Sequence, residues 1–445
     1  MVSLRKISDA VISDPNFLNK LIIQHTVHSE AEMMQLAQDI ALTDLQGGYD
    51  ELPAWRIHRF ENTNGVSGLY MRIHHVIGDG MSMVGAMSQA FKEEDGSNVK
   101  LDFIPIKATS GDGNANNINP TKSEHEAKKK PAVPIFSMMK KVIGAFFEVL
   151  LLPLSSFDAD IKFTSPNKST LTMTGQRKVV YLPCLKLDIV KKIKSKAGVT
   201  LNDVMLSITS GAIGRYCAHM KDPLVNSETM LQNRALVPFA FPRSKEMTND
   251  QTNGMCNYWA FLSIPLPIVL GSKNTTSEVP LSVQRLRTCN SSTKQLKSSP
   301  LAYVALWIQN NLLPLVPSFL AQKTALDLFQ RHTIVFSNVP GPTRPVSFCN
   351  ERVLAIQAIF PNLLPQVILI SYCDAIFANM VLDEKLVTHP ELLSKYYVEE
   401  VMELCKHYNI SFAPEGVKPT PEMLLSKRSA HGGFGVIDVS KFDTR

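Results

Sequence analysis

The chain has 445 residues, of which 44% are hydrophobic and 19% charged, with 46 basic against 40 acidic side chains. This is the composition of a globular protein of two or three domains, and it excludes a fibrous or mostly disordered chain. The net charge of +6 is too small for a dedicated nucleic-acid binder, so no nucleic-acid partner is expected. The same mild excess would suit contact with an anionic membrane surface.

The seven cysteines are too far apart to form a CxxC pattern, and their odd number argues against a disulfide framework. The first 20 residues are mixed and polar and lack the apolar core of a signal peptide. We therefore expect reduced thiols in a cytosol-facing protein. The chain contains no GxSxG, no GxxxxGK[ST] and no HExxH sequence, so neither a resident cofactor nor a metal site is expected.

Hydrophobic periodicity and turn residues predict helices and strands that are mixed along the chain, without strict βαβ alternation. This mixture predicts an α/β fold in which large mixed sheets are covered by helices. In chain order the predicted elements are a helix over Glu30–Ala41, strands over Trp55–Phe60 and Gly68–Val76, a helix over Met81–Lys92, a strand over Arg177–Leu182, helices over Leu185–Ala197 and Leu201–Met220, strands over Asn233–Pro238 and Trp259–Leu266, a helix over Leu301–Gln330 broken at Pro314 and Pro317, strands over Thr333–Asn338, Val353–Ile359 and Val367–Tyr372, and a helix over Glu391–His407.

Two polar stretches divide the chain. Residues 107–131 have few apolar side chains and predict a solvated linker, and a second polar stretch covers 155–176. We therefore expect an N-terminal domain over 1–106, a linker region over 107–176, a C-terminal domain over 177–410 and a loose tail over 427–445. Between the polar stretches, residues 132–154 predict a helix with a narrow polar stripe and a wide apolar face. Such a helix either lies in a membrane interface or packs between domains.

The sharpest local feature is the run from Leu69 to Gly80, LYMRIHHVIGDG. Read with a period of two, it places Leu69, Met71, Ile73 and His75 on one face, while His74 shares the other face with Arg72. An apolar setting favours the neutral imidazole, which can accept a proton. His75 is therefore a candidate general base. Two plainer interpretations stay open: His75 is a satisfied core residue, and Asp79 merely caps the following helix.

His74-His75-Val-Ile-Gly-Asp79-Gly80 has the form HHxxxDG, the motif of the acyltransferase superfamily that resembles chloramphenicol acetyltransferase. Three more stretches narrow the resemblance. They are Leu52-Pro-Ala-Trp55, similar to a PLW motif, Thr200-Leu-Asn-Asp-Val204, similar to TxNDV, and Ser337-Asn-Val-Pro-Gly-Pro342, which matches SNVPGP. Together they resemble the bifunctional wax ester synthase/acyl-CoA:diacylglycerol acyltransferase (WS/DGAT) family. The resemblance covers most of the chain.

The resemblance implies a two-domain fold with the active site in a tunnel between the domains. It carries over His75 as the general base, His74 as its motif partner, Asp79 as the residue that holds the turn, and Gly80 as the tight strand-to-helix connection. Asn257, Asn202 and Asn338 are the implied substrate-binding residues, with Asn257 as a candidate oxyanion donor. Thr200 and Asp203 also form a capping-box pattern, which gives the Asn202 segment a purely structural interpretation.

The implied activity is O-acyl transfer from a fatty acyl-CoA, as co-substrate, to a long-chain alcohol or to diacylglycerol. The implied location is cytosol-facing and membrane-associated, at a peripheral membrane or lipid-droplet surface. Family members usually have more residues before the PLW region than this chain does. An alternative is therefore a catalytically degenerate protein of the same fold that binds acyl-CoA or lipid.

Overall fold

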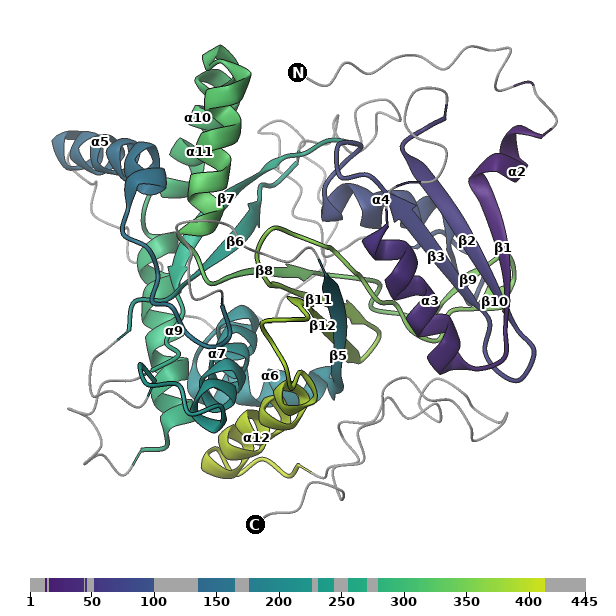
Figure 1. Ribbon diagram of the computed structural model, residues 1–445. Helices are drawn as coiled ribbons and strands as arrows, with labels where there is room; N and C mark the ends of the chain where they lie inside the picture. Colours follow the sequence, from purple (N-terminus) through teal and green to yellow (C-terminus); the bar gives the residue numbers. More distant parts are fainter. Residues whose placement is uncertain are drawn as a thin grey trace, which may run out of the picture.

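The computed structural model describes residues 13, 16–43, 45, 52–99, 135–164, 176–225, 231–243, 255–269 and 279–412. The predicted linker over 107–131 and the predicted tail over 427–445 lie outside these residues. The described residues form a mixed α/β structure with three sheets (Figure 1). The α/β class expected from the sequence is confirmed.

The first sheet belongs to the N-terminal part of the chain. Its strands are β1 (Ile22–Val27), β2 (Trp55–Asn62) and β3 (Gly68–Ile73) in spatial order β1-β2-β3. β1 runs parallel to β2, and β3 runs antiparallel to it. The short helix α2 (Phe17–Leu21) leads into β1, and α3 (Glu30–Leu42) packs on the sheet. Val27, Met33, Ala37, Ile40 and Phe60 form the small core between α3 and the sheet.

The largest sheet has six strands in the order β5-β12-β11-β8-β6-β7. The strands are β5 (Arg177–Lys186), β6 (Arg234–Ala240), β7 (Trp259–Pro265), β8 (Ile334–Val339), β11 (Gln366–Tyr372) and β12 (Ala375–Asp383). β8 is parallel to both of its neighbours, and the other pairs are antiparallel. The sheet is therefore mixed, as the sequence predicts.

Helices cover this sheet and enclose the main core. They are α6 (Leu187–Ala197), α7 (Leu201–His219), α9 (Leu281–Lys297) and α12 (Glu391–His407). α7 is buried along nearly its whole length, because it packs against both α9 and α12. A helix that is buried all round needs no polar face, which explains why α7 between Val204 and Gly214 has only apolar, small and hydroxyl side chains.

A small third sheet joins the two parts of the chain. After α4 (Gly80–Ala90), the two-residue strand β4 (Lys92–Glu93) pairs antiparallel with β9 (Val346–Phe348), which also pairs with β10 (Glu351–Arg352). The Arg344 guanidinium lies 3.1 Å from the Glu93 carboxylate beside this pairing. The N-terminal part is thus hydrogen-bonded directly to a segment that lies far along the chain.

A group of helices projects beyond the sheets at the upper left of Figure 1. It consists of α5 (Ile135–Leu151), the 3₁₀ turn η1 (Leu152–Leu154), α10 (Leu301–Asn311), the 3₁₀ turn η3 (Leu313–Leu315) and α11 (Ser318–Gln330). α5 packs on α10, and η1 packs on α11. No helix among the described residues is both long and apolar enough to cross a membrane.

The six helices predicted in chain order are confirmed to within a few residues, including the break at Pro314 and Pro317, and the helix predicted over 132–154 is α5 with the turn η1. Two strand predictions need correction. The strand from Gly68 ends at Ile73 rather than Val76. The apolar face that carries Leu69 was expected to be buried. Leu69 is instead 40% exposed, and Tyr70 of the other face packs toward the α3 core, so the expected orientation is wrong at this end of the strand. Val353–Ile359 is irregular. Two of its carbonyls accept hydrogen bonds from side chains instead of from a neighbouring strand. The Tyr372 hydroxyl donates to the Val353 oxygen, and the Asn379 amide donates to the Ala358 oxygen.

Candidate active site

The HHxxxDG residues form a tight turn between β3 and α4. The Ile77 N–H donates to the His74 carbonyl at 3.0 Å, which closes the turn. The His74 N–H donates to the Ala54 carbonyl at 2.9 Å, so the PLW-like segment lies against the histidine pair. Because β3 ends at Ile73, the alternation predicted from the sequence does not extend to His75, and the turn sets its direction instead.

The two histidines have different surroundings. His75 is half-buried, and the centroid of its ring lies 5.2 Å from that of Phe360 and 6.1 Å from that of Trp259, edge-on to both. His74 is exposed, and its Nδ1 accepts a hydrogen bond from the Val76 N–H at 3.2 Å. Only His75 therefore faces an apolar, aromatic corner in which a reacting group could be shielded from water.

Asp79 fixes the turn through several buried hydrogen bonds. Its Oδ1 caps α4 by accepting from the Ser82 N–H at 2.9 Å, and it also accepts from Arg243 Nη2 at 2.5 Å. Its Oδ2 accepts from the Tyr258 N–H at 2.9 Å, and its own N–H donates to the Cys256 carbonyl at 3.0 Å. The predicted cap is confirmed, and the carboxylate in addition ties the turn to the segment 256–258.

The glycines of the turn allow close packing. A Cβ on Gly80 would lie 3.1 Å from Val339 Cγ2, and a Cβ on Gly78 would lie 2.7 Å from the Ser82 Cβ. Val339 belongs to the SNVPGP segment at the end of β8. The start of α4 therefore rests directly on this second motif.

Asn257 also contacts the turn. Its amide Nδ2 donates to the His75 carbonyl at 2.9 Å and lies 3.4 Å from the Val76 carbonyl. Its Oδ1 accepts from Trp259 Nε1 at 3.2 Å. Asn257 thus links the His75 backbone to the same tryptophan that packs against the His75 ring. In this geometry its amide supports the turn, and its role as an oxyanion donor stays a prediction.

The other two predicted substrate-binding residues lie together. Asn338 Nδ2 donates to Asn202 Oδ1 at 2.6 Å, which joins the end of β8 to the first turn of α7. The capping box beside them is confirmed: the Asp203 N–H donates to Thr200 Oγ1 and the Thr200 N–H donates to Asp203 Oδ2. Asn338 precedes Val339, so this pair lies one residue from the contact with Gly80. A direct role in binding substrate stays a prediction.

Three neighbours of the candidate site were not identified from the sequence: Trp259, Phe360 and Arg243. The first two form the aromatic corner around His75, and Arg243 neutralises Asp79. Phe360 lies in an irregular segment and Arg243 is followed by residues outside the described part. A sequence motif gives no signal for either, because both act through contacts made across the fold.

The buried cysteines do not offer a nucleophile. Burial raises the pKa of the Cys184 and Cys217 thiols to about 12 and that of Cys405 to about 11, so these thiols stay protonated near neutral pH. Among the described residues no group of three histidine, cysteine or acidic side chains is arranged to hold a metal ion.

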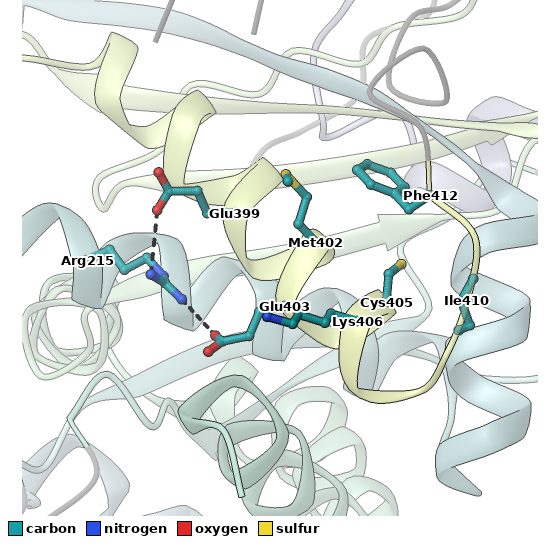
Figure 2. Close-up of a pocket in the computed structure, with 8 residues that line it drawn as sticks. All are labelled: Arg215, Glu399, Met402, Glu403, Cys405, Lys406, Ile410 and Phe412. Atoms are coloured by element: carbon teal, nitrogen blue, oxygen red, sulfur yellow. Dashed lines mark hydrogen bonds and ion pairs between the residues drawn. The ribbon is translucent and has the colours of Figure 1, made fainter. Parts of the chain in front are cut away.

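Figure 2 shows a separate surface cavity of about 480 Å³ between α7 and α12. Arg215 spans it and binds the carboxylates of Glu403 at 2.7 Å and Glu399 at 3.5 Å, as well as the buried Glu400 at 2.6 Å. Glu400 is also held by Arg285, and the absence of a side chain at Gly211 makes room for its carboxylate. This is an ion-pair network that joins two helices, and none of the HHxxxDG residues lines the cavity. The lining residues are Arg215, Glu399, Met402, Glu403, Cys405, Lys406, Ile410 and Phe412.

Comparison with solved structures defines the fold class. The wax ester synthase/diacylglycerol acyltransferase from Marinobacter aquaeolei VT8 superposes with a TM-score of 0.53 at 16% sequence identity, covering 88% of this chain and 81% of that one. The chain therefore shares the fold of that protein, which agrees with the fold class that the HHxxxDG motif predicts.

Comparison of sequences identifies similar proteins. Residues 255–405 match the model of the WS/DGAT C-terminal domain. Wax ester synthase/diacylglycerol acyltransferase 3 of Arabidopsis thaliana is 22% identical over 369 residues, covering 78% of this chain and 71% of that protein. The probable diacyglycerol O-acyltransferase tgs2 of Mycobacterium tuberculosis is 25% identical over 317 residues, covering 68% of this chain and 62% of that protein. The chain is therefore similar in sequence to the wax ester synthase/diacylglycerol acyltransferases, and residues 255–405 are the part that matches their C-terminal domain.

Proposed function

We propose that this protein transfers a fatty acyl group from acyl-CoA to the hydroxyl of a long-chain alcohol or of diacylglycerol, with His75 as the general base. The observation that carries the proposal is the position of His75, half-buried between Trp259 and Phe360 on a turn fixed by Asp79. The names of the plant and mycobacterial relatives support both acceptor classes, and the geometry of the described residues does not choose between them.

The reaction needs no covalent enzyme intermediate. A ring nitrogen of His75 takes the proton from the acceptor hydroxyl as its oxygen attacks the thioester carbonyl carbon. The tetrahedral oxyanion then collapses, the C–S bond breaks, and the imidazolium returns its proton to the departing CoA thiolate. The aromatic corner favours the ester product, because it excludes the water that would otherwise compete as acceptor.

The contacts of the turn hold His75 in place for this proton transfer. Hydrogen bonds from Asn257 and the buried Asp79–Arg243 ion pair fix the backbone at His75 and after it, and the His74 N–H to Ala54 bond fixes it before His75. A base that is held in place before the acceptor arrives loses little freedom in the transition state, which is where orientation lowers the barrier.

The test is release of CoA thiol by the purified chain with palmitoyl-CoA, given hexadecanol or diolein in parallel. We expect release that depends on an acceptor and that falls on the order of 10²–10⁴-fold in His75→Ala. The matched control is His389→Ala, because His389 is an exposed histidine just before α12, paired with Glu391.

Release that persists in His75→Ala would refute the assignment of the base. A folded protein that binds palmitoyl-CoA but releases no thiol with either acceptor would refute the transferase, and would instead support the alternative of a degenerate binding protein with the same fold.

A further inference from the structure

The projecting helices carry an unusual amount of exposed apolar surface. Single exposed hydrophobic side chains are normal on a soluble surface, but a contiguous group of them marks an interaction site. Phe136 is 81% exposed, Leu315 79% and Phe319 71%. The full set of large exposed apolar residues on these elements, called here the apolar ridge, is Phe136, Met138, Met139, Val142, Ile143, Phe147, Leu150, Leu151, Leu154, Tyr303, Trp307, Leu313, Leu315, Phe319, Leu320 and Leu326.

Two distant parts of the sequence supply the apolar ridge, and they pack against each other in the group of projecting helices. α5 packs on α10 through Ala145, with Phe146 and Val149 against the same core, and η1 packs on α11. On α5 and α10 the residues turned toward this core are buried, and the exposed residues are those turned away from it. They do not result from poor packing of the two helices, since both helices share an apolar core with Phe241, Ala260 and Leu262.

We propose that the apolar ridge docks this protein on the surface of an anionic phospholipid bilayer. The ridge projects from the body of the molecule (Figure 1), and a projecting apolar surface inserts into a fluid interface without needing a complementary groove. Lys140 and Lys141 are exposed on α5 among the ridge residues, where they can reach lipid phosphates. An amphipathic helix with lysines beside a Phe-, Leu- and Met-rich face is the type that lies in a membrane interface.

An aromatic row connects the apolar ridge to His75. Phe329 of α11 lies 5.4 Å from Phe261, Phe261 lies 4.6 Å from Trp259, and Trp259 contacts His75. Gln309 of α10 also donates to the Trp259 carbonyl at 3.2 Å. Docking at the ridge would therefore place the lipid phase at one end of a row of apolar rings that ends at the proposed base. This link to catalysis rests on the proposed function, whereas docking itself does not.

The test is flotation of the purified full chain with vesicles of phosphatidylcholine alone or with about a third phosphatidylserine. The variant is the triple change Phe136→Ser, Leu315→Ser and Phe319→Ser, because these side chains are mostly in water and contribute little to the fold. We expect the wild type to float with anionic vesicles and the triple variant to lose binding at least tenfold, since each lost side chain removes a large apolar area from the interface.

The matched control removes three exposed apolar residues elsewhere: Leu18→Ser, Leu224→Ser and Leu281→Ser. It should float like the wild type. Lys140→Glu with Lys141→Glu should weaken binding to anionic vesicles more than to neutral ones. Circular dichroism must show that each variant is folded.

Three results would overturn the proposal: a wild type that does not float, a triple variant that floats like the wild type, and a control variant that loses binding equally. A wild-type dimer that the triple variant converts to monomer, without flotation, would assign the ridge to a second copy of the chain. None of these readouts measures turnover, so failure of the transferase and failure of docking are distinguishable.

Discussion

Asn257 is placed to position His75, the proposed base. Its amide binds the His75 carbonyl and its oxygen binds Trp259, so its loss would free both the turn and one wall of the aromatic corner. For Asn257→Ala we expect kcat to fall about tenfold or more while KM for acyl-CoA changes little, because positioning acts on the transition state.

Steady-state kinetics with palmitoyl-CoA and hexadecanol measure kcat and KM separately. Asn202→Ala provides a comparison, because Asn202 belongs to the hydrogen-bonded pair with Asn338. If Asn257 is instead the oxyanion donor that the family resemblance implies, Asn257→Gln should not recover activity. Partial recovery by Asn257→Gln would favour positioning. An unchanged kcat in Asn257→Ala would refute both roles.

A second residue-scale prediction concerns a histidine pair in the N-terminal sheet. His25 Nε2 and His58 Nδ1 are 3.0 Å apart on β1 and β2, and His58 is buried. Burial, followed by the charges of His25, Arg72 and Arg56, lowers the pKa of His58 to about 4. The folded protein thus keeps His58 neutral at pH values where the unfolded chain, with an ordinary histidine pKa near 6.5, binds a proton.

Folding stability should therefore be unaffected by His58 above about pH 6.5 and should fall as the pH drops from there toward 4. The slope can reach about 1.4 kcal/mol per pH unit for one proton. Thermal unfolding at pH 7, 6 and 5 measures this loss. His58→Gln should flatten the dependence, whereas His389→Gln, at an exposed site, should not. Equal slopes in the wild type and His58→Gln would contradict the prediction.

At the scale of elements, the SNVPGP segment depends on a close approach between backbones. A Cβ on Gly341 would lie 2.1 Å from the Ser371 carbonyl oxygen, which belongs to the neighbouring strand β11. We expect Gly341→Ala to separate β8 from β11 at this end and to destabilise the protein by about 1–3 kcal/mol, the usual cost of overpacking. Urea denaturation measures the change.

Gly85→Ala is the matched control for this substitution. Gly85 lies inside α4, and a Cβ there meets no atom within 4 Å. Alanine is the better helix former by up to about 1 kcal/mol, so this variant should be neutral or more stable. If both variants behaved alike, the close approach at Gly341 would not be what requires glycine.

The elements also show what sequence patterns can and cannot predict. The helix Glu391–His407 was predicted with the observed ends, because an amphipathic helix shows its period in the sequence. β12 was missed, because its residues are buried on both faces and show no alternation. α9 was missed as well, since its Ser- and Thr-rich sequence has weak helix propensity and packing against α7 stabilises it instead.

At the candidate site, too, local features could be predicted from the sequence and contacts made by tertiary packing could not. The HHxxxDG spacing identified His75 and Asp79, because a motif is local and the turn it encodes is local. The aromatic corner was not identified, because Trp259 and Phe360 reach His75 only when β7 and an irregular segment are brought to the turn by the fold. Nor did the sequence identify Arg243, whose charge is needed only once Asp79 is buried.

At the scale of the whole molecule, the site lies where the N-terminal part meets the C-terminal part. The contacts across this junction are varied: the Asp79–Arg243 ion pair, the β4–β9 pairing, and a hydrogen bond from the Val179 N–H to Gln38 Oε1 at 2.9 Å. An apolar cluster also crosses it, in which Phe91 packs with Val346 and Tyr372. The N-terminal part has only a small core of its own, so much of its stability must come from this junction.

We therefore expect the two parts to unfold as one cooperative unit. Trp55 lies in β2, whereas Trp259 and Trp307 belong to the C-terminal part, so a protein with Trp259→Phe and Trp307→Phe reports only on the N-terminal sheet. Its Trp55 fluorescence and its far-ultraviolet circular dichroism should show coincident urea transitions, which is the test of two-state behaviour. Adding Arg243→Met leaves Asp79 buried without its partner, which typically costs about 3–5 kcal/mol, and should shift both transitions together. A Trp55 transition at lower urea than the dichroism transition would show that the N-terminal part opens alone. The His75 turn could then separate from Trp259 without global unfolding.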